Sequence, residues 1–475
     1  MSTAIKVVRN TVIQSIGRAL MMGMSLISMA LITRYLGPLE YGLYSFVLVF
    51  IAFFHTVTDL GLKVIATREI SQDRDSSGNL LSQTITLRLL LSFFSIFLAC
   101  LIINCMNYPL TTKFLVYVSS IILIIEALKS TLDIIFEVSL RMEYVAVSNL
   151  LISLSFLILA CLFVYKRGTL LDLIVVSLVS NLIGLLTAYF FSKKFVKIKF
   201  SIDYRLWKKM IKEAIPLGIA FLMISLYWRI DVIMLSLMKG DQAVGFYNVS
   251  YKFIEMGTLL SGMIMVSVFP VLSERFKLDP AQLKIIYQRS LKYLLMMGIF
   301  LALFFVILAD KIILYVSGEE FKNSILSMQI LGFIYPVYYI GALIGYMLIA
   351  IGKQWINTIF NTLAVLFNIV LNLILIPGYS FYGSSLATVI TEVVQVTAAL
   401  IVLSSFKYTP SFKSITRSLF AGALSLLVLI LPAEVNSIIK VILALIIFLS
   451  TLFLMKELSK EDLSLLLNKP VIQER

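Results

Sequence analysis

The chain has 475 residues, of which 60% are apolar and only 14% are charged, and its mean hydropathy is +0.99. Soluble domains have about 45–50% apolar and about 25% charged residues, so this composition excludes a water-soluble fold. The 40 Lys and Arg exceed the 26 Asp and Glu, which gives a net charge of +14. The sequence therefore predicts a polytopic membrane protein without a separate catalytic domain.

Fourteen apolar runs occur along the chain, each close to the length of about 20 residues with which a helix crosses a bilayer. They are too long for barrel strands, so we predict an all-α polytopic membrane protein with about 14 transmembrane helices. No small-residue cleavage site follows the first run, which we interpret as a retained span. The runs cover residues 12–33, 42–62, 84–106, 115–136, 144–165, 170–191, 214–238, 246–272, 291–316, 325–350, 355–377, 382–405, 416–432 and 436–455.

The basic residues are distributed unevenly between the two sides of these spans. With the N-terminus in the cytoplasm, 27 of the 40 Lys and Arg fall in cytoplasmic segments, seven in outer loops and six within spans. Cytoplasmic loops of membrane proteins are enriched in Lys and Arg, so both termini are predicted to be cytoplasmic. The same asymmetry accounts for the net charge without a nucleic-acid partner.

The chain contains an internal repeat at the outer ends of its helices. The sequence GPLEYGLYSFV at 37–47 recurs as GDQAVGFYNVS at 240–250. Six spans separate the copies, so the two halves have the same orientation and predict two pseudo-symmetric six-helix lobes with a binding site at their interface. The aligned pairs, 203 residues apart, are Gly37 with Gly240, Gly42 with Gly245 and Tyr44 with Tyr247.

We predict four segments from this repeat. Residues 1–192 form the N-terminal lobe, 193–213 a basic cytoplasmic linker, 214–405 the C-terminal lobe, and 406–475 two extra helices and a cytoplasmic tail.

The linker contains an amphipathic pattern, which favours an interfacial helix on anionic lipid over a plain basic linker. Lysines at 208, 209 and 212 lie off its apolar face, which consists of Leu206, Trp207, Met210, Ile211 and Ala214.

Eleven ionisable residues lie within the predicted spans. At about 3 kcal/mol each, their exposure to lipid would cost roughly 30 kcal/mol, more than the typical net stability of about 5–15 kcal/mol. Most must therefore face a wet interior or one another. These residues are Arg18, Asp59, Arg88, Glu126, Lys129, Asp133, Arg229, Asp231, Lys252, Glu255 and Glu392.

Several of them form polar stripes along single helices. In the run 115–136 and just beyond it, Glu126, Lys129, Asp133 and Glu137 lie within an arc of about 80°. Three carboxylates exceed the one lysine, so they cannot all be paired locally, which favours a cavity. Interhelical hydrogen bonding is the alternative, and it is favoured for the asparagines. The other stripes are Asn357, Asn361, Asn368 and Asn372; Thr388, Glu392 and Gln395; and Asn248, Lys252 and Glu255.

Two residues have competing interpretations. Arg229 lies well inside its span, and its guanidinium could bind phosphate or pair with Asp231. His55, the only histidine, could be a packed polar residue or, because it shares a face with Asp59, part of a proton relay.

The sequence resembles a known transporter family in four segments that follow one another in the expected order. It is similar to the polysaccharide-repeat-unit flippases (O-antigen, Wzx-type) of the multidrug/oligosaccharidyl-lipid/polysaccharide exporter superfamily. The last segment carries two Asn, an Ile-Pro helix end, a Gly-small-small turn and an Ala-Thr helix start. The segments are RYLGPLEYGLYSF at 34–46, RIDVIMLSLMKGDQAVGFYNVSYKFIE at 229–255, FPVLS at 269–273 and NIVLNLILIPGYSFYGSSLATVITE at 368–392.

The resemblance implies a location in the bacterial inner membrane and an undecaprenyl-diphosphate-linked oligosaccharide as cargo. It implies a polysaccharide polymerase and a chain-length regulator as partners, and neither a cofactor nor a metal. It also implies a V-shaped cavity whose cations contact the diphosphate, with Arg18, Arg88, Lys129, Arg229 and Lys252 as candidates. The candidate cavity or ion-coupling carboxylates are Asp59, Glu126, Asp133, Asp231, Glu255 and Glu392.

Three alternatives stay open at this stage. A lipid II flippase also has fourteen spans but a denser arginine cluster early in the chain, and a drug exporter of the same superfamily would have an acidic cavity. An integral membrane enzyme is disfavoured because every outer loop is short and the lone histidine lies in mid-span. No G-x-x-x-x-G-K-[ST] loop for ATP occurs, so we expect transport to be driven by ions acting through membrane carboxylates.

Overall fold

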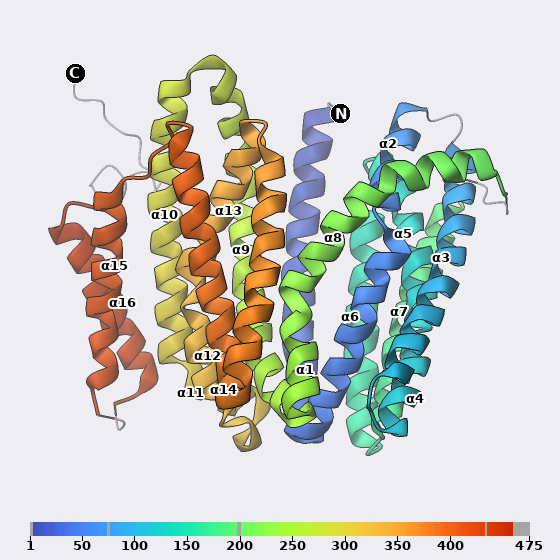
Figure 1. The fold of residues 1–475 in the computed structure, drawn as a ribbon, viewed down its shortest axis with the longest axis horizontal. Coiled ribbons are helices and arrows are strands. Elements are labelled where there is room, and N and C mark those ends of the chain that lie inside the picture. Colours follow the sequence, from blue (N-terminus) through green and yellow to red (C-terminus); the bar gives the residue numbers. More distant parts are fainter. Residues whose placement is uncertain (1–2, 74–76, 197–200, 433–434, 459–475) are drawn as a thin grey trace. The chain divides into compact units, whose positions relative to one another are not determined.

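In the computed structural model the chain is almost entirely helical (Figure 1). The structure describes residues 3–73, 77–196, 201–432 and 435–458, and these contain no strand, which confirms the all-α prediction. The elements are α1 (Thr3–Asp59), α2 (Leu62–Gln72), α3 (Ser77–Cys105), α4 (Leu110–Ser119), α5 (Ile122–Val138), α6 (Met142–Tyr165), α7 (Leu170–Ser192), α8 (Tyr204–Lys239), α9 (Asp241–Leu278), α10 (Pro280–Ile307), α11 (Ala309–Ser317), η1 (Glu319–Phe321), α12 (Ser324–Gly332), α13 (Ile334–Ala350), α14 (Gln354–Ser405), α15 (Phe412–Leu426), η2 (Leu427–Ile430) and α16 (Ser437–Leu454).

Eleven helices in the described ranges are long and apolar enough to cross a membrane, or twelve if the bent pair α12–α13 is one span. The predicted run at 115–136 is divided between α4 and α5, and the run at 291–316 between α10 and α11. Multiple apolar helices confirm the polytopic membrane class. The number of fourteen crossings and the cytoplasmic termini stay predictions.

Two long helices each contain a break where two predicted runs meet. The 57-residue α1 covers the first two runs, and Gly37 between them has φ 68° and ψ 178°. Glycine tolerates this positive φ, and Pro38 then starts the next helical segment without needing a hydrogen-bonded N–H. The 52-residue α14 covers the runs at 355–377 and 382–405, and it breaks at Ser380 (φ 52°, ψ −135°), just after Pro377.

The internal repeat is confirmed in the backbone. Gly240 has φ 81° and ψ 178°, nearly the same conformation as its aligned partner Gly37. A Cβ atom on Gly42 would overlap the carbonyl oxygen of Asp241, and a Cβ atom on Gly245 would overlap that of Pro38. Because Pro38 aligns with Asp241, the two repeat segments contact each other reciprocally.

A short hydrogen-bonded chain fixes the start of α9 beside this contact. The Tyr108 hydroxyl donates to Ser236 Oγ at 2.9 Å, and Ser236 donates to the Asp241 carboxylate at 3.0 Å. Burial raises the pKa of the Tyr108 phenol to about 12, so the phenol keeps its proton at neutral pH and remains a donor.

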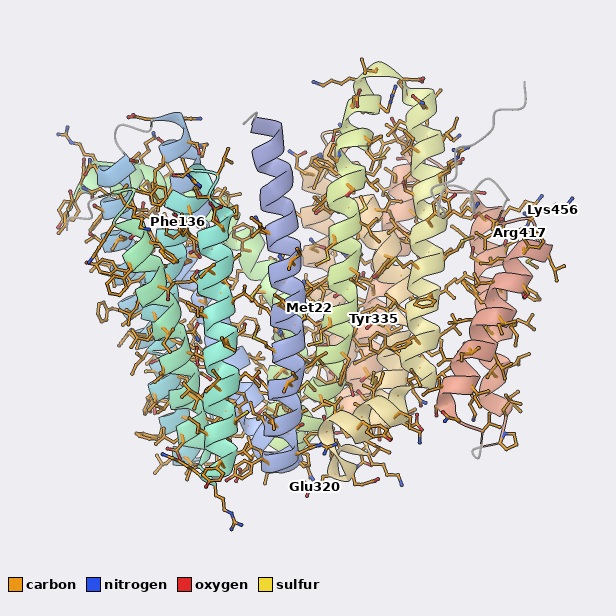
Figure 2. The ribbon with its side chains drawn as sticks, turned by 180° about the vertical axis from the view of Figure 1, so that it is seen from behind. Met22, Phe136, Glu320, Tyr335, Arg417 and Lys456 are labelled. Carbon is orange, nitrogen blue, oxygen red and sulfur yellow. The ribbon has the colours of Figure 1, made fainter. Side chains whose placement is uncertain are left out.

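The chain divides into two compact units, each with its own core. Unit 1 consists of residues 1–248 and 316–320, and unit 2 of residues 249–315 and 321–475. Phe136 is fully buried in unit 1, and Tyr335 is fully buried in unit 2 (Figure 2). The predicted lobe boundaries at 192 and 214 do not coincide with this division and stay a prediction.

Hydrogen bonds and an ion pair join further helices within unit 2. The Tyr335 and Tyr339 hydroxyls of α13 donate to the backbone carbonyls of Phe253 and Gly257, one turn apart on α9, at 3.1 and 2.9 Å. In the C-terminal addition, Arg417 of α15 lies at the same end as Lys456, which follows α16 (Figure 2), and it pairs with the neighbouring Glu457 at 3.3 Å.

The amphipathic part of the predicted linker forms the first turns of α8. Asp203 caps this helix by accepting hydrogen bonds from the N–H groups of Arg205 and Leu206. Within unit 1 these turns cross the ends of α2, α3 and α5 before α8 turns along the bundle (Figure 1). Trp207, Met210 and Ala214 are buried in a core cluster with residues of those helices, so protein covers the apolar face assigned to lipid. Whether these turns lie on a membrane surface stays a prediction.

Candidate functional site

The polar stripe on α5 is the centre of an interhelical network in unit 1. Lys129 donates to Asp133 at 2.8 Å, one turn along α5, and to the side-chain oxygen of Asn149 on α6. Only 12% of the Lys129 side chain and 6% of the Asp133 side chain are exposed. Two opposite charges removed from water need such partners, because an unpaired buried charge costs several kcal/mol.

The remaining carboxylates of the stripe pair with bases from other helices. His55 Nε2 of α1 lies 3.6 Å from Glu126, and Lys63 Nζ of α2 lies 2.7 Å from Glu137. Only Asp133 is thus paired with a base on its own helix, and the other two carboxylates take their bases from α1 and α2. Glu126 is still 38% exposed, and His55 is 34% exposed.

Arg88 of α3 is the most deeply buried cation of the predicted set, with 1% of its surface exposed. Its Nη2 lies 2.9 Å from Oδ1 of Asp59 at the end of α1, and its Nη1 donates to the Thr131 hydroxyl on α5 at 2.9 Å. Asp59 also accepts a hydrogen bond from the backbone N–H of Gly61. The pair therefore joins α1, α3 and the turn into α2, while the Arg88 Nε has no hydrogen-bond partner in the described ranges.

Three further predicted residues of unit 1 lie outside this network. Arg18 on α1 is exposed, and Arg229 on α8 is half-buried. Asp231 is 2% exposed and accepts a hydrogen bond of 2.6 Å from the Tyr247 hydroxyl on α9. In this conformation Arg18 and Arg229 are thus more exposed than Asp231, which is almost completely buried.

The predicted residues of unit 2 differ in their burial. Lys252 and Glu255 on α9 form a 3.2 Å pair whose side chains are 36% and 30% exposed. Glu392 on α14 is 5% exposed and lies close to Gly341 of α13, where a Cβ atom would be 3.4 Å from the carboxylate. Unit 2 therefore contributes one accessible cation and one deeply buried carboxylate.

The asparagine stripe makes hydrogen bonds both within the first half of α14 and between its two halves. Asn372 donates to the Asn368 side chain at 2.9 Å, Ser384 donates to Asn372 at 2.7 Å, and Gln395 donates to Asn361 at 2.8 Å. This agrees with the interpretation of these residues as interhelical hydrogen-bonding groups.

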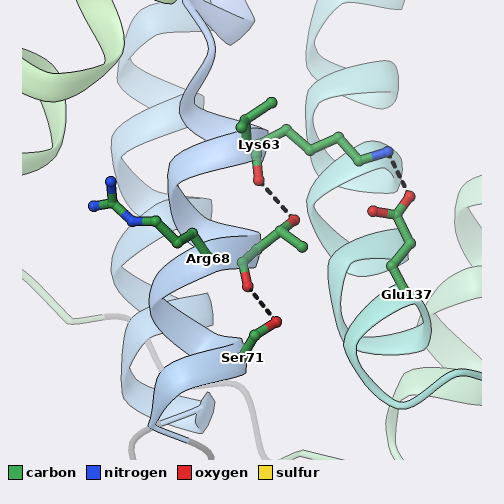
Figure 3. Close-up of a pocket in the computed structure, with 6 residues that line it drawn as sticks. Lys63, Arg68, Ser71 and Glu137 are labelled. Carbon is green, nitrogen blue, oxygen red and sulfur yellow. Dashed lines mark hydrogen bonds and ion pairs between the residues drawn. The ribbon is translucent and has the colours of Figure 1, made fainter. Parts of the chain in front are cut away.

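A cavity of about 460 Å³ opens between α2 and α5 in unit 1, lined by Lys63, Val64, Thr67, Arg68, Ser71 and Glu137 (Figure 3). Lys63 reaches across it to Glu137, and the Thr67 and Ser71 hydroxyls donate to backbone carbonyls one turn earlier at 2.7 Å. Arg68 points away from Glu137 and pairs with Glu69 and Glu213. The polar groups that line the cavity are thus engaged in ion pairs or hydrogen bonds. None of the predicted cargo or coupling residues lines the cavity.

The structure brings the predicted residues together in pairs. Asp59 meets Arg88, Lys129 meets Asp133, and Lys252 meets Glu255. Sequence reasoning missed the partners Asn149, Thr131 and Tyr247. Asn149 had a usable signal, because it is the one amide in its apolar run.

Comparison with known proteins places the chain in a family. A family model described as polysaccharide biosynthesis protein matches residues 7–276, more than half of the chain, and a MatE model matches residues 216–374. The Staphylococcus aureus capsular polysaccharide biosynthesis protein CapF is 22% identical over 251 residues. That match covers 52% of this chain and 58% of the relative, so the chain spans little more than half the length of this curated relative.

Solved structures show the same fold. The lipid II flippase MurJ in an inward closed conformation has a TM-score of 0.79 at 17% identity and covers 93% of this chain and 98% of its own. An inward-facing multidrug resistance MATE transporter has a TM-score of 0.69 at 16% identity, with 81% and 94% covered. A Pyrococcus furiosus transporter of the MOP superfamily has a TM-score of 0.57 at 16% identity, with 85% and 96% covered.

These matches confirm the resemblance inferred from the sequence segments. The chain belongs to the polysaccharide biosynthesis protein family and has the fold of MurJ and the MATE transporters.

Proposed function

We propose that this protein is a flippase that moves undecaprenyl-diphosphate-linked oligosaccharide repeat units from the cytoplasmic to the outer leaflet of the bacterial inner membrane. The observation that carries the proposal is the polysaccharide biosynthesis family match over residues 7–276. The fold, which the chain shares with a lipid II flippase, and the name of the capsular polysaccharide relative support it. In this proposal the chain crosses the membrane fourteen times, both termini are cytoplasmic, and the lobes 1–192 and 214–405 alternate in access.

The cargo's diphosphate must be met by cations that it can reach. Arg88 and Lys129 are only 1% and 12% exposed, so a phosphate cannot reach them in this conformation. Arg18 is exposed and Arg229 and Lys252 are half-buried. We therefore assign diphosphate contact to Arg18, Arg229 and Lys252, and a structural role to Arg88 and Lys129. An arginine suits phosphate especially well because its planar guanidinium can donate two parallel hydrogen bonds.

Coupling to an ion gradient needs a carboxylate that water can reach. Glu126, 38% exposed, is the most exposed of the six acidic candidates, ahead of Glu255 at 30%, and His55 lies beside it. Asp59, Asp133, Asp231 and Glu392 are more buried. We propose that the His55–Glu126 pair exchanges the coupling proton, while the buried carboxylates hold helices together.

Two other transport functions have specific support. The TM-score of 0.79 to MurJ favours lipid II as an alternative cargo, and the MatE match over residues 216–374 favours drug export. A diphosphate lipid is common to the first alternative and to our proposal, so only the glycan distinguishes them. A drug exporter needs no diphosphate contact.

The test is a deletion strain in which the surface polysaccharide and its lipid-linked intermediate are quantified together. A repeat-unit flippase predicts loss of surface polymer and accumulation of the undecaprenyl-diphosphate-linked unit, both reversed by the wild-type gene. A lipid II flippase predicts accumulated lipid II and arrested cell-wall synthesis instead. Intact polysaccharide combined with new sensitivity to cationic drugs would move the assignment to drug export.

A further inference from the structure

The first turns of α8, residues 204–214, are called the α8 arm here, and the side facing away from the protein carries a row of cations. Arg205, Lys208 and Lys212 are exposed and lie within an arc of about 60° at 100° per residue. We call these three residues the outer stripe. Trp207 and Met210, on the opposite side of the same turns, are 7% and 1% exposed.

The glutamates around the α8 arm pair with other cations, and Asp203 at its start caps the helix through the N–H groups of Arg205 and Leu206. Within the ranges that the structure describes, no ion pair joins a residue of the outer stripe to a carboxylate. The stripe's charge is therefore directed outward and is not neutralised by the protein. The pairs around the arm are Arg68 with Glu69 and Glu213, Lys209 with Glu69, Lys63 with Glu137, and Arg141 with Glu143.

The same side of α8 becomes apolar one turn later. Ile215 and Ile219 are 45% and 56% exposed, and they share an arc of about 60° with Lys208 and Lys212. One helical side that changes from cations to exposed isoleucines within about 5 Å is what the boundary between lipid phosphates and acyl chains requires. Tyr204, which is 75% exposed, has the amphipathic character of residues at that boundary.

The α8 arm is held firmly on unit 1. The buried Gln83 amide of α3 donates to Ser201 at 2.5 Å and accepts from the backbone N–H of Asp203 at 2.8 Å. Trp207 and Met210 pack into the core cluster beside it. The outer stripe is therefore carried by a segment that is packed into the core of unit 1.

We infer that the outer stripe binds the phosphate groups of anionic phospholipids in the leaflet at this end of the molecule, and that this contact anchors unit 1 at the membrane surface. Clustered Lys and Arg next to a span are attracted to anionic lipid. The direct continuation into exposed isoleucines selects lipid over an acidic protein, because a partner in water would leave those isoleucines uncovered.

The test uses the full chain in nanodiscs of phosphatidylcholine with a minority of phosphatidylglycerol. The protein is then extracted from the nanodiscs in detergent, and the lipids that stay bound to it are measured by mass spectrometry. The fraction of phosphatidylglycerol among the bound lipids, divided by its fraction in the supplied bilayer, gives the enrichment. The variant combines Arg205→Gln, Lys208→Gln and Lys212→Gln, all exposed and without carboxylate partners, so the fold is expected to survive. The control combines Lys166→Gln, Arg167→Gln and Lys322→Gln, which removes three other exposed cations.

The expected result is enrichment in the wild type and the control, and a composition close to that of the bulk bilayer in the outer-stripe variant. Enrichment should also fall as salt is raised, because exposed charges are screened. Equal enrichment in the variant and the wild type would overturn the inference. The inference would also be overturned if enrichment were unchanged and the variant lost an acidic protein that copurifies with the wild type. The outer stripe would then bind protein.

Discussion

A Cβ atom placed on Gly42 would lie 2.8 Å from the backbone nitrogen of Gly245, the glycine that aligns with it 203 residues later in the repeat. Each of these glycines also lies against a backbone carbonyl of the other copy, Gly42 against Asp241 and Gly245 against Pro38. A carbonyl on a helical backbone cannot rotate away as a flexible side chain can. The repeat is therefore preserved where two backbones must approach closely.

Substitution of Gly42 or Gly245 by Ala is expected to destabilise the protein by about 1–3 kcal/mol, because the added methyl group meets backbone on the facing segment. Gly23→Ala, in the same helix as Gly42, is the matched control because a Cβ atom there has no neighbour within 4 Å. It should be neutral or stabilising, since Ala favours the helix by about 1 kcal/mol over Gly. Thermal unfolding in detergent measures all three. Equal midpoints for Gly42→Ala and Gly23→Ala would contradict the close approach.

The Arg88–Asp59 pair is expected to show strong coupling. Arg88→Gln leaves the Asp59 carboxylate largely buried without its ion-pair partner, and Asp59→Asn leaves the 1% exposed guanidinium alone. Removing one member of a buried pair costs about 3–5 kcal/mol, so each single variant should unfold well below the wild type. The double variant should recover part of the loss, which a double-mutant cycle of unfolding free energies measures.

The control for this cycle is Arg141→Gln with Glu143→Gln. That pair is 52% and 28% exposed, and exposed pairs contribute about 0–1 kcal/mol. Additive losses at Arg88 and Asp59, as small as those at the control pair, would refute a buried structural pair.

Much of the fold could be predicted from the sequence because hydropathy alone fixes which segments enter a membrane. All fourteen predicted runs lie on helices or helix pairs, and the breaks at Gly37 and Ser380 fall between predicted runs. What hydropathy could not reveal is what covers an amphipathic face. The side of α8 that contains Trp207 and Met210 fits lipid and protein equally well in sequence, and the structure places it on protein.

The candidate site was only partly predictable, for a related reason. Helical periodicity places residues on a face but gives no information about the neighbouring helix. It identified the α5 stripe, yet the bases that complete it, His55 and Lys63, come from α1 and α2. The same limit hid the Arg88–Asp59 pair, whose members are 29 residues apart in sequence.

If Glu126 carries the coupling proton, Glu126→Gln should make transport insensitive to the pH gradient without unfolding the protein. Its side chain is 38% exposed, so loss of its interaction with His55 should cost at most about 1 kcal/mol. Transport by proteoliposomes with and without an imposed gradient measures the effect. Glu137→Gln, which changes the other end of the α5 stripe, should keep its gradient dependence. A gradient response retained by Glu126→Gln would assign coupling to another carboxylate.

Arg229 and Lys129 should respond differently to substitution because they differ in burial. Arg229 is half-buried and is assigned to the diphosphate, so Arg229→Gln should lose complementation of the deletion strain. Arg229→Lys should restore part of the function, because an ammonium group keeps the charge and loses the bidentate geometry. Lys129→Gln should instead lower the unfolding midpoint, because it leaves Asp133, only 6% exposed, without its cation. Full complementation by Arg229→Gln would remove this residue from the cargo site and leave Arg18 and Lys252 as the accessible cations.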